Sequence, residues 1–170
     1  MRNSSYNYYL SQEFAGTRCV EGMDNRQKYE NYKEQFKRLD KAFRYEFYLE
    51  ALFIEFAIME DRTESILRYA GKWEAYLKKR GKYQITIDSK LKYISHFAQE
   101  KGSLLNKYFG DDLLDKIAVW KDDRNKLIHA LMKQSLTTED LREIATRGKT
   151  LTTALRNKST NYRRAVECYK

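Results

Sequence analysis

Apolar and polar positions follow a helical period along most of this chain. From Asp24 to Ala70, apolar residues recur every three or four positions, which is typical of amphipathic helices. One continuous helix of that length would span about 70 Å, which is too long for a compact domain. A break is therefore expected within this stretch, and Asp40 is the best available cap for a second helix.

The helix expected after Asp40 is apolar around much of its circumference, so we predict that it lies at the centre of the fold. Gly71 is predicted to end this helix, because glycine is the usual residue just past a helix C-terminus. Residues 72–87 are predicted to form a basic connector, and Asp88 or Ser89 is predicted to cap a third helix.

Two further helices are predicted in the C-terminal half. A short segment lies between Gly102 and Gly110. After it, Asp111 is predicted to begin a helix that runs from Leu113 to about Lys133. Residues 137–140 have the sequence of a capping box, which predicts a last helix after them. Together these elements predict an all-α fold, a bundle of four to five helices with short connections.

Composition agrees with this fold class. The 170 residues include no proline and only 7 glycines, so helix breakers are sparse. The length suits one domain with its own core. Residues 1–23 are polar and lack a sustained period, so we predict a flexible N-terminal tail there and a helical domain over residues 24–170.

The formal net charge of +9 favours anionic partners such as RNA, DNA or an acidic protein. Cys19 and Cys168 have neither metal-ligand spacing nor a disulfide framework, so a reduced, cytoplasmic compartment is the plain interpretation. No stretch resembles a signal peptide or a membrane span, so no membrane partner is expected. The sequence has no zinc pattern and no phosphate-binding glycine loop, so no cofactor or metal is expected.

The candidate chemistry lies on the helix that follows Asp111. Its apolar residues fall at positions 113, 117, 120, 127 and 131. Steps of four and three residues along this face leave one gap, position 124, which we call the seam position. Arg124 stands there in place of an apolar residue. A charge there is costly unless it is paired or faces a cavity. Arg124 therefore belongs to a site, extends its charged end to water along the apolar surface, or pairs with an acid on the central helix. The candidate acids are Glu55, Glu60 and Asp61.

Asn125 and His129 are four residues apart, so they share one edge of the same helix. His129 lies about 140° further round an ideal helix than Arg124, so the two side chains do not converge neatly within one helix. A second copy of the helix across a two-fold axis would bring two arginines and two histidines into one groove. Arginine can neutralise a phosphate, and histidine can take or give a proton near neutral pH.

The spacing Arg124-Asn125-x-x-x-His129 resembles the signature of the HEPN superfamily, in which arginine is followed, after four to six residues, by histidine. Residues 45–67 are also similar to the central second helix of bacterial HEPN-like proteins, and the resemblance covers about residues 25–155. It implies a compact helical bundle and a homodimer with the motif helices at the interface. In catalytic members the motif forms a composite, metal-independent endoribonuclease site.

The resemblance also implies roles for single residues. Arg124 would bind the scissile phosphate, His129 would be the general base or acid for attack by the RNA 2′-OH, and Asn125 would orient the ribose, the phosphate or His129. The expected products are a 2′,3′-cyclic phosphate and a 5′-hydroxyl. The further candidates are two lysines for substrate binding and two supporting acids: Lys121, Lys126, Glu60 and Asp61.

The function expected from this resemblance is a ribonuclease that serves as a toxin or an anti-phage defence effector. Its expected partners are RNA, a second copy of the chain, and an antitoxin or regulatory protein. Leu131 stands where HEPN toxins paired with nucleotidyltransferase antitoxins usually carry tyrosine, so neutralisation by AMPylation at that position is not supported. The alternative is a non-catalytic HEPN-like module that dimerises and holds RNA or a protein partner.

Overall fold

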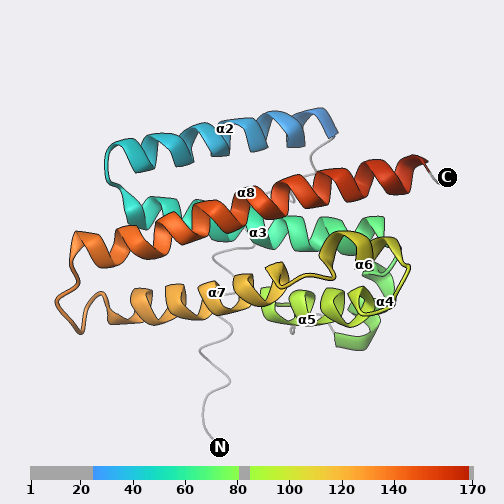
Figure 1. Cartoon of the computed structure of the whole chain (residues 1–170). Coiled ribbons are helices and arrows are strands. Elements are labelled where there is room, and N and C mark those ends of the chain that lie inside the picture. Colours follow the sequence, from blue (N-terminus) through green and yellow to red (C-terminus); the bar gives the residue numbers. More distant parts are fainter. Residues whose placement is uncertain (1–24, 81–84, 169–170) are drawn as a thin grey trace, which may run out of the picture. The chain divides into compact units, whose positions relative to one another are not determined.

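The computed structural model describes residues 25–80 and 85–168, and these residues form α-helices without any strand (Figure 1). In chain order the helices are α2 (Asn25–Arg44), α3 (Tyr48–Tyr69), α4 (Trp73–Arg80), α5 (Ile87–Ala98), α6 (Leu104–Phe109), α7 (Leu113–Ala130) and α8 (Thr138–Cys168). The all-α prediction is confirmed. The tail predicted for residues 1–23 lies outside the described residues.

The described helices outnumber the four or five predicted, because α4 and α6 lie in segments that the sequence pattern assigned to connections. The predicted basic connector contains α4, in which the buried rings of Trp73 and Tyr76 stack with their centres 5.5 Å apart. The short piece between Gly102 and Gly110 contains α6, which buries Leu105 and Phe109. Each short helix thus adds aromatic side chains to the core.

The chain divides into two units after Gln35, within α2. In the described part of the first unit, Gln35 Nε2 donates to Asn31 Oδ1 at 3.2 Å, and Lys33 pairs with Glu30 at 4.0 Å. The predicted site residues all lie in the second unit, which begins at Phe36.

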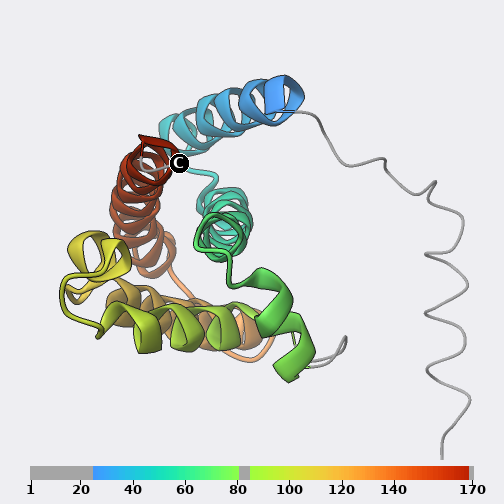
Figure 2. The same cartoon turned by 90° about the vertical axis from the view of Figure 1, so that its right-hand side faces the viewer.

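α3 lies at the centre of the second unit, as its apolar surface predicted. It packs most extensively on α8 and also contacts α5 and α4, while α7 packs on α8 and α5 (Figures 1 and 2). The core between these helices contains large side chains that are almost fully buried: Leu52, Met59, Ile66, Ile94, Ile117, Trp120 and Leu155. Burial of each such side chain contributes about 1.5–3 kcal/mol to folding. The described helices include none with the length and apolar character needed to cross a bilayer.

The break predicted at Asp40 was wrong. Asp40 lies inside α2, and its carboxylate pairs with Lys149 of α8 at 2.9 Å. The chain instead turns between Arg44 and Tyr48, where Glu46 has a φ of 59°, in the left-handed region. The turn uses backbone geometry and no side-chain cap on α3, so a search for a capping side chain misses it.

Gly71 ends α3 as predicted, with a φ of 65° and its N–H donating to the Arg68 carbonyl at 3.0 Å. The cap predicted for α5 at Asp88 or Ser89 was wrong, because Thr86 is the N-cap. Ser89 N donates to Thr86 Oγ1 at 3.2 Å, and Thr86 N donates to Ser89 Oγ at 3.1 Å. Ser89 therefore takes the third helical position of a capping box.

The capping box predicted for residues 137–140 is confirmed. Thr137 N donates to Asp140 Oδ2 at 2.8 Å, and Asp140 N donates to Thr137 Oγ1 at 3.2 Å. This reciprocal pair satisfies two backbone donors that helix geometry leaves free at the start of α8.

Candidate functional site

Arg124, Asn125 and His129 lie on α7 beyond the point where α5 packs against it. Lys90, near the start of α5, pairs with Glu60 of α3 at 3.5 Å, and Asp88 of α5 pairs with Lys121 of α7 at 2.5 Å. α5 therefore begins level with Glu60 and Lys121. α7 continues past this level in Figure 1, and Arg124 lies in the turn of α7 that follows.

Arg124 is half-buried and contacts two aromatic rings of α3. Its guanidinium carbon lies 4.9 Å from the ring centre of Phe53 and 4.8 Å from that of Phe56. Its Nη1 donates to Asn125 Oδ1 at 3.1 Å, and its Nε is buried without a hydrogen-bond partner among the described residues. Burial lowers the pKa of Arg124, but arginine remains charged at neutral pH.

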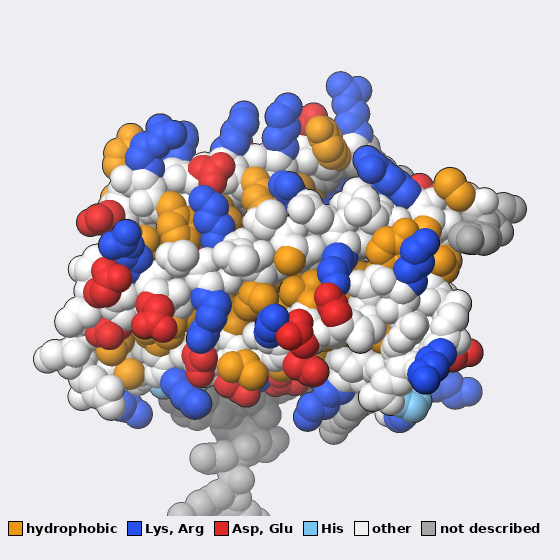
Figure 3. All heavy atoms as spheres, viewed as in Figure 1, with side chains coloured by type: hydrophobic (Ala, Val, Ile, Leu, Met, Phe, Trp, Pro, Cys, Tyr) orange, Lys and Arg blue, Asp and Glu red, His pale blue; other side chains and the backbone are white. Residues whose placement is uncertain are grey.

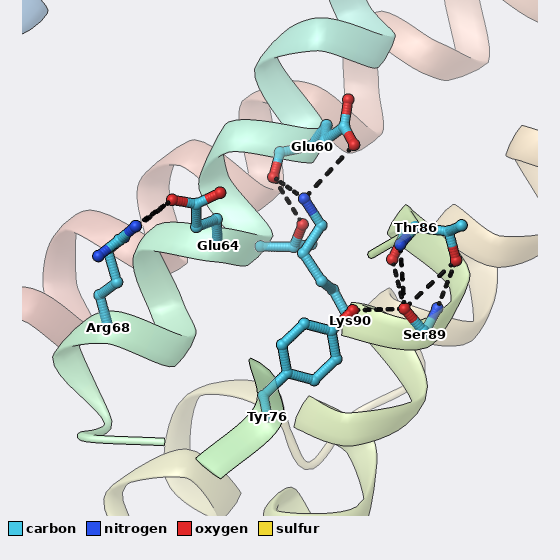
Figure 4. Close-up of polar contacts among 8 residues, drawn as sticks. Glu60, Glu64, Arg68, Tyr76, Thr86, Ser89 and Lys90 are labelled. Carbon is cyan, nitrogen blue, oxygen red and sulfur yellow. Dashed lines mark hydrogen bonds and ion pairs between the residues drawn. The ribbon is translucent and has the colours of Figure 1, made fainter. Parts of the chain in front are cut away.

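No acid among the described residues forms an ion pair with Arg124, so the pairing considered for Glu55, Glu60 or Asp61 is absent. Glu60 instead accepts from Lys90, whose Nζ also donates to the Glu60 backbone carbonyl at 3.2 Å (Figure 4). Asp61 accepts a hydrogen bond from Ser65 Oγ at 3.4 Å. The two predicted supporting acids, Glu60 and Asp61, thus have contacts other than Arg124.

Asn125 and His129 line one shallow hollow of about 510 Å³ on the surface of α7, as their spacing of four residues predicted. His129 is exposed, and Asn125 is half-buried. The rest of the hollow is lined by Asp122, Lys126, Ala130, Lys133 and Gln134. Arg124 does not line this hollow; it is connected to it through its hydrogen bond to Asn125.

The two lysines predicted to bind substrate differ in their surroundings. Lys121 is only 7 % exposed, and its ammonium group bonds to Asp88 at 2.5 Å and Asp122 at 2.7 Å. Burial alone would lower the pKa of Lys121, but the hydrogen bonds to Asp122 and Asp88 outweigh burial and raise it. Lys126 is exposed, with Asp123 3.8 Å away, and lines the hollow that contains His129. Of the two, only Lys126 is open to an anion.

Phe53 and Phe56 were missed as site residues. The sequence pattern placed Phe53 among the apolar residues of a helix expected to be central, because that helix is apolar around much of its circumference, and it did not single out Phe56. The spacing of three residues, which places them on one face of α3, was the available signal.

Basic and acidic side chains are interspersed on the face of the molecule shown in Figure 3. Several basic residues of α8 on this unit pair with acids: Lys158 with Asp111, Arg147 with Asp123, and Lys149 with Asp40. These pairs neutralise part of the positive charge of α8. The positive net charge alone therefore does not define a nucleic-acid surface.

Comparisons of the chain with protein-family models, with curated proteins and with solved structures found no match. Among the residues that the structure describes, no three histidine, cysteine or acidic side chains converge into a group that could hold a metal ion. The residues that suggest a function are therefore Arg124, Asn125 and His129, together with the side chains that contact Arg124.

Proposed function

We propose that the chain is a metal-independent endoribonuclease of the HEPN type, a toxin or anti-phage defence effector that acts as a homodimer. The observation that carries this proposal is the state of Arg124. It is charged, half-buried and not neutralised by an acid among the described residues, and it is hydrogen-bonded to Asn125. A cation held in this way is suited to bind an anion, and Asn125 shares a hollow with His129.

The proposed reaction needs only these groups and the 2′-hydroxyl of RNA. Arg124 binds the scissile phosphate and stabilises the charge that develops on its oxygens. The imidazole of His129 takes the proton of the 2′-hydroxyl as the O2′–P bond forms. The P–O5′ bond then breaks, and the 5′ oxygen takes a proton from an imidazolium. The products are a 2′,3′-cyclic phosphate and a 5′-hydroxyl, and DNA is not a substrate because it lacks the nucleophile.

A dimer would complete this site. On an ideal helix, Arg124 and His129 are separated by about 140° of rotation and about 7.5 Å of rise, so one helix does not bring them together. Two copies of α7 related by a two-fold axis would place the arginine of one copy near the histidine of the other. Ile128 and Leu131, which follow Arg124 near the seam, are only half-buried and form an apolar strip that a second copy would cover.

One observation favours the alternative, a non-catalytic module that holds RNA or a protein. His129 makes no hydrogen bond to the described residues, whereas a catalytic base is usually oriented by another group. In the dimeric enzyme that orienting group would have to come from the second copy or from the substrate. In the binding module His129 needs no partner.

Cleavage of a mixed tRNA and mRNA panel in excess EDTA tests the proposal. We expect the wild type to cleave, His129→Ala to lose about 10²–10⁴-fold in rate, and the product ends to be 2′,3′-cyclic phosphate and 5′-hydroxyl. His96→Ala is the matched control, because His96 is the only other histidine and is also exposed. Equal cleavage by His129→Ala, or loss of wild-type cleavage in EDTA, would contradict the proposal. A folded dimer that binds RNA without cleaving it would support the binding module.

A further inference from the structure

Phe53 is unusually exposed for a residue of the central helix. It exposes 56 % of its side chain, although α3 buries ten of its residues in the core. The ring nevertheless lies against the guanidinium of Arg124, at 4.9 Å from ring centre to guanidinium carbon. Phe56, which is half-buried, contacts the same guanidinium at 4.8 Å. Phe56 thus anchors Arg124 in the fold, while much of Phe53 remains accessible to a ligand.

The aromatic contacts leave Arg124 able to bind an anion. Rings attract a guanidinium through its face, whereas phosphate oxygens accept hydrogen bonds from the N–H groups at its edge. Asn125 is the only hydrogen-bond partner of Arg124 among the described residues, so donors remain on the guanidinium. The surface therefore combines a phosphate-binding group with an exposed aromatic ring directly beside it.

A nucleotide has both matching parts, a phosphate and a planar base. We propose that Phe53 is a base-stacking residue, which binds an unpaired RNA base next to the phosphate held by Arg124. The choice of RNA as the ligand rests on the function proposed above. The role of Phe53 as a stacking surface rests on its exposure and its contact with Arg124.

This placement determines the class of substrate. Bases within a duplex are stacked on one another, so their faces are not available to a protein ring. A base in a loop, a bulge or a single-stranded end can leave the stack and pack on Phe53. Because every base has such a face, the contact selects unpaired RNA without selecting a particular base.

Phe47, the residue immediately before α3, provides a matched control for Phe53. Its side chain is 59 % exposed, close to the value for Phe53, so its removal changes a similar amount of exposed apolar surface. Its ring lies 6.1 Å from that of Tyr45, and no cation among the described residues contacts it. Loss of Phe47 should therefore not affect a nucleotide bound at Arg124.

The test is the affinity for a labelled single-stranded RNA, measured by fluorescence anisotropy in the His129→Ala background so that the probe stays intact. Phe53→Ala should weaken binding about 5- to 150-fold, Phe53→Tyr should retain it, and Phe47→Ala should leave it unchanged. Affinity for the same sequence in a duplex should not depend on Phe53. The salt dependence of binding should keep its slope in Phe53→Ala, because the lost contact carries no charge.

Three results would overturn the inference. The first is equal single-strand affinity for Phe53→Ala and Phe47→Ala, and the second is an equal loss for single strand and duplex. The third is conversion of a dimer to a monomer by Phe53→Ala in sedimentation, which would mean that a second copy covers the ring. If cleavage depends on His129 but RNA affinity does not change in Phe53→Ala, the stacking role of Phe53 is wrong and the proposed ribonuclease still stands. Phe53-dependent binding without cleavage by the wild type would overturn the ribonuclease and leave the stacking role standing.

Discussion

Glu55 is a carboxyl group in the core without a hydrogen-bond partner for either oxygen among the described residues. It lies on the central helix α3, is 0 % exposed, and packs against Gly148 on α8, which the indole of Trp120 on α7 also approaches. Burial raises the pKa of Glu55 to about 9, and the positive charge of Lys149 reduces this effect. Glu55 is therefore protonated in the folded chain at neutral pH.

This pKa makes stability depend on pH in a defined direction. Below about pH 4.5, Glu55 is protonated in both the folded and the unfolded chain, so it adds no pH dependence. Between about 4.5 and about 9 only the unfolded chain releases the proton, so the free energy of unfolding falls as pH rises. The fall is about 1.4 kcal/mol per pH unit, or about 4 kcal/mol between pH 5 and pH 8.

Glu55→Gln removes the titration while keeping the shape of the side chain. The free energy of unfolding, measured by urea denaturation at a series of pH values, should increase relative to the wild type by about 4 kcal/mol between pH 5 and pH 8. Taking the difference between the two proteins cancels the other titrating groups. Glu50→Gln, at an exposed site on the same helix, makes the same chemical replacement outside the core and should show no such trend. A difference between wild type and Glu55→Gln that stays constant over this pH range would mean that burial does not raise the pKa of Glu55.

Two further substitutions test the packing around the same helices. Gly148→Ala should lower the free energy of unfolding by about 1–3 kcal/mol, because its methyl group would overlap Glu55 and lie 2.7 Å from Trp120 Nε1. This loss should exceed the gain from the higher helix propensity of alanine. A melting temperature no lower than that of the exposed control Thr150→Ala would contradict this prediction. Thr86→Ala should cost about 1 kcal/mol by removing the N-cap of α5, whereas Thr146→Ala, exposed within α8, should cost less in the same melt.

The sequence predicted the parts of the fold that local side-chain chemistry determines. The helical period gave the all-α class, and Gly71 and the pair Thr137 and Asp140 marked helix ends because their effects act within a few residues. The turn after Arg44 could not be predicted in this way. Glu46 adopts a positive φ that its residue type does not favour, so the position of the turn depends on how the neighbouring helices pack.

The candidate site shows the same division between local and tertiary causes. The seam position of Arg124 and the shared edge of Asn125 and His129 follow from the helical period, and both could be predicted. The burial of Lys121 and the exposure of Phe53 could not, because both depend on where α5 begins relative to its neighbours.

The short length of α5 explains why Arg124 and the exposed ring of Phe53 lie together beyond its end. α5 has 12 residues, against 22 in α3 and 18 in α7, and it begins level with Glu60 and Lys121. Past that level, none of the described helices lies between α3 and α7, and Arg124 stands at the position of α7 that a buried apolar side chain would otherwise take. A leucine at this position would extend the core, whereas arginine keeps the surface charged and open. The site proposed here thus arises where the core of the bundle ends.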